Sequence, residues 1–168
     1  EQPIEKDRYR LLWAALCPYA HRAVIARKLL GLDKVISLGT LDYRRGEDGW
    51  QFSLDPDGVD PILKKPTLKS VYNYSEPNYE GPYSVPALVD LKTEKIVRKE
   101  SAEILHEFAT VFKPLHKEGA IDLYPESLAK QIDEWNEKLA IAVNDGVYGM
   151  GFAKTQDEYD LAFNRFFD

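Results

Sequence analysis

The chain has 168 residues, a formal net charge of −6 and a sequence pI of about 5.2. This acidic balance argues against a nucleic-acid-binding protein, because such proteins usually present a basic face. No apolar run approaches the length of a membrane span, and the first residues, EQPIEK, contain no signal-peptide core. A single cysteine cannot form an internal disulfide framework, so we expect a protein of the reducing cytoplasm. One cysteine and three scattered histidines also give no zinc-site pattern, so we expect no metal.

The first part of the chain predicts a strand, a helix and a second strand. Residues 9–16, YRLLWAAL, form a short apolar run that is typical of a buried strand. A helix is expected from about Pro18 to Leu30, with Gly31 following it as a C-cap. Residues 34–41, KVISLGTL, predict the second strand. This order implies a parallel pair of strands with a right-handed crossover.

A long irregular segment, residues 42–82, comes before the next strands, and a short helix is expected within it over Pro66–Tyr74. Strands over Tyr83–Asp90 and Lys95–Arg98 then predict an antiparallel hairpin. A further helix is expected from about Lys99 to Phe112. The order β-α-β-loop-β-β-α is the thioredoxin arrangement, an α/β domain with a mixed sheet.

Pro86 lies near the start of the third predicted strand. Proline is normally excluded from central strands because it cannot donate to the ladder of hydrogen bonds. In the thioredoxin arrangement this position holds a cis X–Pro bond that faces the active cysteine. The alternative is an ordinary trans proline at a strand edge, which is the commoner state of X–Pro bonds.

The rest of the chain is helical. We expect residues 1–113 to form the thioredoxin-like domain, 114–124 a linker, and 125–168 the beginning of an all-α domain. The residues Asn144–Gly146 are expected to break its first helix, and Thr155 and Glu158 form a capping-box pattern for a last one. Two residue sets stand out: inward apolar positions at Leu128, Ile132, Trp135, Leu139 and Val143, and phenylalanines without an evident partner at Phe163, Phe166 and Phe167.

Cys17 stands where the first strand turns into the first helix, directly before Pro18. Proline fits the first helical turn, so the Cys17 sulfur is expected to lie over the free N–H groups of a helix start. The positive end of the helix dipole favours the thiolate, which is the nucleophilic form. No second cysteine is present to resolve a mixed disulfide, so this chemistry needs an external thiol. The alternative is that Cys17 is a small buried apolar residue.

The sequence resembles the glutathionyl-hydroquinone reductases, the xi class of glutathione transferases. Residues 17–22, CPYAHR, are similar to their Cys-Pro-Trp-Ala-His-Arg signature, with Tyr19 in place of tryptophan. The similarity extends over nearly the whole chain. Further matching runs are Gly49–Phe52, Val85–Leu88, Glu100–Ile104, Asp122–Pro125 and Asn144–Ala153.

The resemblance implies an enzyme that reduces glutathionyl-hydroquinones with glutathione as co-substrate, through a mixed disulfide of Cys17 with glutathione. Trp50 would fold over the glutathione, and Val85, before Pro86, would pair with its main chain. Glu100 would bind the γ-glutamyl ammonium group and Ser101 the γ-glutamyl carboxylate. Each has a plainer alternative: Trp50 as a loop-anchoring aromatic side chain, and Glu100 with Ser101 as a helix N-cap.

Tyr148 would lie on the hydroquinone side of the site; its alternative is a packing tyrosine. In this class the helical domain continues beyond the equivalent of Asp168, so the chain is expected to be truncated and the complete protein to be a homodimer. Its partners are small molecules, not nucleic acid or membrane.

Two other functions stay open: an omega-like thioltransferase or dehydroascorbate reductase, and a non-catalytic binding module of the same fold, as in chloride-intracellular-channel-like proteins. The runs Gly49–Phe52 and Gly146–Tyr148 favour the reductase.

Overall fold

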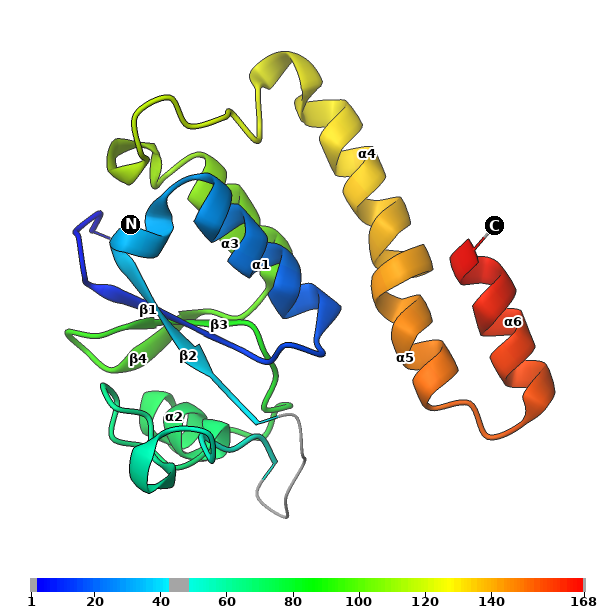
Figure 1. Cartoon of the computed structure of the whole chain (residues 1–168), viewed down its shortest axis with the longest axis horizontal. Helices are drawn as coiled ribbons and strands as arrows, with labels where there is room; N and C mark the ends of the chain where they lie inside the picture. Colours follow the sequence, from blue (N-terminus) through cyan, green and yellow to red (C-terminus); the bar gives the residue numbers. More distant parts are fainter. Residues whose placement is uncertain (1–2, 43–48, 168) are drawn as a thin grey trace. The chain divides into compact units, whose positions relative to one another are not determined.

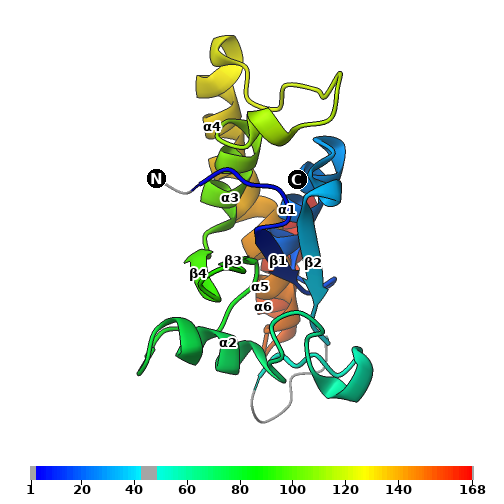
Figure 2. The ribbon, with the colours of Figure 1, turned by 90° about the vertical axis from the view of Figure 1, so that its left-hand side faces the viewer.

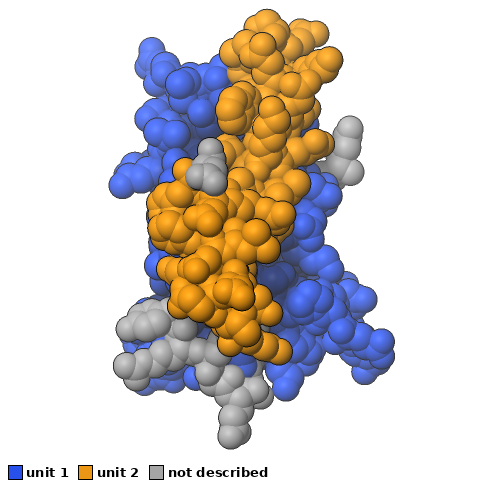
Figure 3. Space-filling model, turned by 90° about the vertical axis from the view of Figure 1, so that its right-hand side faces the viewer, with its two compact units in different colours: residues 1–123 blue, residues 124–168 orange. Residues whose placement is uncertain are grey.

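A computed structural model of the chain describes residues 3–42 and 49–167. The chain divides into two compact units, residues 1–123 and residues 124–168, which Figure 3 shows in different colours. Among the described residues, no helix is both long enough and apolar enough to cross a membrane.

The first unit contains a four-stranded sheet with the strand order β2-β1-β3-β4 (Figure 1). The strands are β1 (Tyr9–Trp13), β2 (Ile36–Thr40), β3 (Ala87–Asp90) and β4 (Lys95–Arg98). Strand β1 runs parallel to β2 and antiparallel to β3, and β3 and β4 form an antiparallel hairpin. The expected mixed sheet, with its parallel pair and its antiparallel hairpin, is thereby confirmed.

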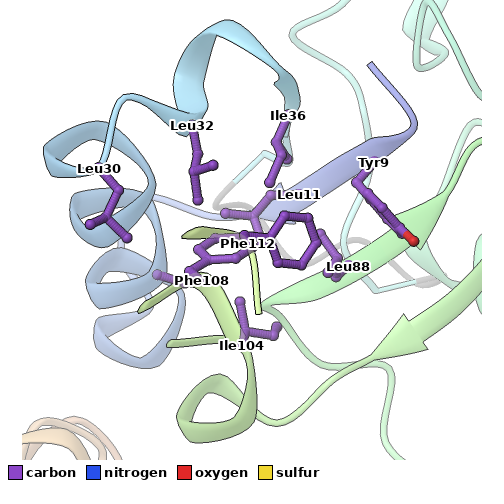
Figure 4. Close-up of a cluster of buried hydrophobic side chains, with 10 residues drawn as sticks. Tyr9, Leu11, Leu30, Leu32, Ile36, Leu88, Ile104, Phe108 and Phe112 are labelled. Carbon is purple, nitrogen blue, oxygen red and sulfur yellow. The ribbon is translucent and has the colours of Figure 1, made fainter. Parts of the chain in front are cut away.

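Helices lie on both faces of this sheet. Helices α1 (Pro18–Leu29) and α3 (Ser101–Ala109) lie side by side on one face, and α2 (Leu68–Ser75) lies on the other (Figures 1 and 2). The main core fills the space between α1, α3 and the sheet (Figure 4). Its buried members are Tyr9, Leu11, Ala23, Leu30, Leu32, Ile36, Leu88, Ile104, Phe108 and Phe112.

Local signals account for the ends of these helices. Pro18 occupies the first turn of α1, and Gly31 follows the helix with φ = 75°, a left-handed conformation that glycine adopts readily. Helix α2 begins after Thr67, which forms a reciprocal capping box with Ser70. The helix expected over Pro66–Tyr74 is therefore present, starting two residues later.

The second unit contains α4 (Ala129–Leu139), a π-helical turn (Ala140–Asn144), α5 (Asp145–Gly151) and α6 (Gln156–Phe167). The predicted break at Asn144–Gly146 is wrong, because Asn144 and Asp145 keep right-handed helical dihedral angles. Gly146 is buried, and a Cβ atom there would lie 3.1 Å from the Phe166 ring. The glycine thus provides space for helix packing instead of ending a helix.

Three further expectations for this unit are met only in part. Trp135 is 61% exposed, and Leu128 and Leu139 are exposed as well, because the helices that pack together here are α5 and α6. Phe166 does find a partner in Gly146, whereas Phe163 and Phe167 are exposed. The capping pattern forms in a variant way: the Thr155 hydroxyl accepts from the Glu158 N–H, but the Glu158 carboxylate accepts from the N–H of Lys154.

Candidate functional site

Cys17 is the N-cap residue of α1 and connects this helix to the end of the β1 segment. Its backbone is extended, with φ = −86° and ψ = 111°, and Pro18 begins the helix, as the sequence predicts. The backbone N–H of Cys17 donates to the Ala14 carbonyl, and its own carbonyl accepts from the His21 N–H. The residue is only 3% exposed. The tight turn and the helix start therefore hold the sulfur at a fixed position.

The peptide bond between Val85 and Pro86 is cis, which confirms the expectation from the fold. The Cys17 thiol donates to the Val85 carbonyl, with 3.5 Å between sulfur and oxygen. Val85 and Pro86 are both buried. The structure thus brings together three of the predicted site residues from two separate parts of the chain.

Tyr72 of α2 supports the segment that leads to the cis proline, a contact that no sequence pattern predicted. Its hydroxyl donates to the carbonyl of Ser84, directly before Val85, at 2.8 Å. Tyr72 is 2% exposed, and burial raises the pKa of its phenol. The side chain therefore remains a neutral hydrogen-bond donor at physiological pH.

Glu100 and Ser101 lie at the start of α3. Glu100 is the N-cap residue, yet its exposed side chain makes no capping hydrogen bond. Glu100 therefore occupies the N-cap position, as in the plainer alternative, but its carboxylate is not used to cap the helix. Ser101 is 5% exposed and is linked to α1 through Arg22.

Arg22 was in the quoted motif but was given no role in the sequence analysis. Its Nε and Nη2 atoms both donate to the Ser101 hydroxyl oxygen, at 3.1 and 2.6 Å. Burial lowers the pKa of its guanidinium group, and its charge also lies over the ring of Tyr19. The available sequence signal was an arginine in the second turn of the helix that follows Cys17, but its partner Ser101 lies 79 residues away.

Trp50 lies between the end of β2 and the start of α2. Its carbonyl accepts from the Leu68 N–H at 2.9 Å, and the neighbouring Gln51 bridges to Thr67 and accepts from the Asp42 N–H. These backbone contacts position Trp50 at a half-buried place. The preceding residues 43–48 lie outside the described part of the chain. A role for Trp50 over a ligand stays a prediction.

Tyr148 belongs to the second unit, on α5. It is partly buried, and its ring stacks on Phe152 with 6.1 Å between ring centroids. Its predicted place on the substrate side of the site stays a prediction. Within residues 3–42 and 49–167, no group of three or more His, Cys, Asp or Glu side chains is arranged to hold a metal ion.

Residues 16–111 match the family model described as "Glutathione S-transferase, N-terminal domain". The chain belongs to this glutathione S-transferase family. The matched segment contains Cys17, Val85, Pro86, Glu100 and Ser101, so the site described above lies inside the family domain.

Two curated proteins and two solved structures are similar to nearly the whole chain. It is 41% identical to the glutathione S-transferase omega-like 2 of Schizosaccharomyces pombe, over 93% of this chain and 51% of that protein. It is 40% identical to the glutathionyl-hydroquinone reductase YqjG of Escherichia coli, over 98% of this chain and 50% of that protein. The glutathione-bound structure of YqjG has a TM-score of 0.86 at 42% identity, covering 97% of this chain and 53% of that one.

The structure of the glutathione S-transferase Xi from Phanerochaete chrysosporium also has a TM-score of 0.86, at 41% identity, covering 98% of this chain and 57% of that one. The resemblance to glutathionyl-hydroquinone reductases and to the xi class is thereby confirmed. The chain spans about half the length of the curated relatives it matches.

Proposed function

We propose that the protein is a glutathione-dependent thiol transferase that reduces glutathionyl-hydroquinones to hydroquinones. The observation that carries this proposal is the position of Cys17 at the start of α1, with its sulfur 3.5 Å from the Val85 carbonyl that precedes the cis proline. The similarity to a curated glutathionyl-hydroquinone reductase and to a glutathione-bound structure supports the choice of substrate and thiol.

The reaction has two steps. The Cys17 thiolate attacks the sulfur of the glutathionyl-hydroquinone; a sulfur–sulfur bond forms, the carbon–sulfur bond breaks, and the hydroquinone carbon takes the electron pair and a proton. A second glutathione, as its thiolate, then attacks the Cys17–glutathione disulfide. Oxidised glutathione leaves, and the Cys17 thiolate is restored. The external thiol is needed because Cys17 is the only cysteine of the chain.

The binding roles follow from the groups that glutathione carries. Val85 would pair with its extended main chain, as a sheet edge pairs with a peptide. The exposed carboxylate of Glu100 would pair with the γ-glutamyl ammonium group, and Ser101 at the start of α3 would bind the γ-glutamyl carboxylate. Trp50 would cover the bound glutathione, and Tyr148 would contact the hydroquinone.

The proposal also covers the domain organisation, the cellular compartment and the oligomeric state. Residues 1–113 would form the glutathione domain, 114–124 a linker, and 125–168 part of a helical domain. The protein would work in the cytoplasm, where thiols are kept reduced, and the whole protein would be a homodimer. Sedimentation of the protein isolated from its own cells tests the dimer, and fractionation of those cells tests the compartment.

The decisive experiment incubates the protein with glutathionyl-menadiol and glutathione. We expect menadiol and oxidised glutathione in equal amounts from the wild type, and no turnover from Cys17→Ala or Cys17→Ser. Intact-mass measurement after treatment with oxidised glutathione should show one added glutathione, which dithiothreitol removes. Turnover by Cys17→Ala, or the absence of any adduct on the wild type, would refute the proposal.

A second function is favoured by the similarity to a relative named omega-like. In this alternative the same Cys17–glutathione disulfide forms, but the substrate is a protein mixed disulfide or dehydroascorbate. The two functions separate in one assay series: a glutathione adduct on Cys17, with turnover of dehydroascorbate but none of glutathionyl-menadiol, would select the omega-like activity.

A further inference from the structure

We propose that Arg22 fixes the Ser101 hydroxyl as a hydrogen-bond donor to the γ-glutamyl α-carboxylate of glutathione and supplies the positive charge for that carboxylate. This inference rests on the proposed function, because it names how one end of the same ligand is bound. Arg22 is a positioning residue in this scheme, distinct from the nucleophile Cys17, which lies five positions earlier on α1.

The Ser101 hydroxyl is engaged as a hydrogen-bond acceptor. Its oxygen accepts two hydrogen bonds from Arg22, one from Nε and one from Nη2, at 3.1 and 2.6 Å. A hydroxyl group has two acceptor lone pairs and a single hydrogen to donate. With both lone pairs engaged by the guanidinium group, the hydrogen points away from Arg22. The hydroxyl is thus prepared to meet an acceptor, such as a carboxylate, and not a donor.

Within residues 3–42 and 49–167 no acidic side chain forms an ion pair with Arg22; its contacts are the Ser101 oxygen and the ring of Tyr19. A desolvated guanidinium group without a counter-charge is unfavourable. Arg22 also lies in the second turn of α1 and bonds to Ser101, the first residue of α3, so the partial positive charges of two helix N-termini add to its own. An anion from outside the chain relieves both unfavourable terms at once.

The groups at the start of α3 indicate which anion this is. The α3 start presents a buried serine beside an exposed, uncapping carboxylate at Glu100. A cation and a hydroxyl donor can bind a carboxylate, and a neighbouring acidic side chain can bind an ammonium group. Together they match the α-amino acid end of a ligand, which carries a carboxylate and an ammonium group on one carbon. The γ-glutamyl end of glutathione has this pair. Arg22 and Ser101 would hold its carboxylate while Glu100 holds its ammonium group.

Arg27 offers a matched control on the same helix. Like the partly buried Arg22, it is an arginine of α1 whose guanidinium donates to neutral oxygens, here the carbonyls of Ile36 and Asp33. Arg27 is buried, and burial lowers its pKa too. It lies in the last turn of α1, at the end opposite Cys17. A purely structural role of a buried arginine should therefore affect both positions alike, whereas a role in ligand binding is confined to Arg22.

The test uses the Cys17→Ser background, which binds without turnover, and two ligands measured by isothermal titration calorimetry. One ligand is glutathione; the other is its analogue with the glutamyl α-carboxylate converted to an amide. We expect the parent to prefer glutathione by roughly tenfold or more, since a charged hydrogen bond is replaced by a neutral one. Arg22→Met should abolish this preference, Ser101→Ala should reduce it, and the double variant should lose no more than Arg22→Met alone. Arg27→Met should leave it unchanged.

The outcomes separate this inference from the proposed function. If the parent binds neither ligand, the glutathione assignment itself fails. If the parent prefers the carboxylate and Arg22→Met keeps that preference, the role of Arg22 is refuted while the proposed function stands. Circular dichroism and thermal unfolding verify that each variant is folded. Arg22→Lys, which keeps the charge but loses the planar pair of donors, is the second variant, and an undiminished preference in it would overturn the role of Arg22 in fixing the Ser101 hydroxyl.

Discussion

Arg10 of β1 and Asp60, 50 residues further along the chain, form an ion pair that is closed off from solvent. The Arg10 Nε and Nη2 atoms both donate to one carboxylate oxygen of Asp60, at 2.9 and 2.8 Å. The other oxygen accepts from the backbone N–H groups of Ile62 and Leu63. The pair therefore joins the sheet to the loop that leads into α2, the helix whose Tyr72 bonds to Ser84, two residues before Pro86.

Removal of one partner of this pair should destabilise the fold strongly. Asp60→Asn leaves the buried Arg10 charge without its counter-charge, so we expect a loss of about 3 kcal/mol or more in the free energy of unfolding. Urea unfolding followed by circular dichroism measures this loss. Glu94→Gln is the control, because the Glu94–Lys65 pair is partly exposed with 3.7 Å between its charged atoms, and it should change stability by less than about 1 kcal/mol. Equal effects of the two variants would contradict the assignment.

Asp90 predicts a specific loss of stability in acid. Its hydrogen bonds from the Arg8 side chain lower its pKa below the ordinary value, so the folded state favours the ionised carboxylate. The stabilisation is therefore fully present above the unfolded-state pKa of about 3.9 and is lost as the pH falls through the lower folded-state pKa.

Urea midpoints measured between pH 6 and pH 2 test this expectation. Asp90→Asn should lower stability at pH 6 and flatten its decline below pH 4, since the substituted side chain no longer takes up a proton. Asp33→Asn is the control, because the Asp33 carboxylate lies 3.6 Å from an exposed Lys34 side chain. An Asp90→Asn profile parallel to that of the wild type would show that Asp90 does not contribute to the acid transition.

Substitution of Gly31 by alanine should destabilise the fold for two reasons, which can be measured separately. The Gly31 φ of 75° is unfavourable for a residue with a side chain, and a Cβ atom there would lie 2.6 Å from the Cβ of Lys117. Gly119→Ala isolates the first reason, because Gly119 has φ = 67° and no atom within 4 Å of the added carbon. We expect a loss of about 1 kcal/mol for Gly119→Ala and a clearly larger loss for Gly31→Ala, measured by urea unfolding. Equal losses would show that Lys117 moves aside freely.

Glu100 should contribute to the affinity for glutathione without contributing to the fold. Its carboxylate makes no capping hydrogen bond, so Glu100→Gln should leave the melting temperature unchanged. Loss of a charged hydrogen bond to the ligand ammonium group should weaken glutathione binding by about 30-fold. Glu103→Gln, an exposed residue one turn further along α3, serves as the control for binding measured by calorimetry. Equal affinities of Glu100→Gln and wild type would remove Glu100 from the site.

Features governed by neighbouring residues could be predicted from the sequence. The Cys17–Pro18 helix start, the glycine after α1 and the β3–β4 hairpin all follow from local backbone preferences, and all are present. The cis bond before Pro86 was predicted through the fold assignment, because the order of the elements identified the thioredoxin arrangement. The roles of Trp50 and Tyr148 at the ligand stay predictions.

Features that depend on packing between distant residues could not be predicted from the sequence. Gly146 is a poor helix residue by propensity, at a cost of about 1 kcal/mol, yet the helix continues because the missing side chain admits the ring of Phe166. Arg22 with Ser101, and Arg10 with Asp60, lie 79 and 50 residues apart, so no local pattern links them. The sequence by itself determined where Cys17 stands and which helix begins beside it, since backbone preferences act over a few residues. Only the tertiary structure decided which buried charges meet, because a charge withdrawn from water must find its partner across the fold.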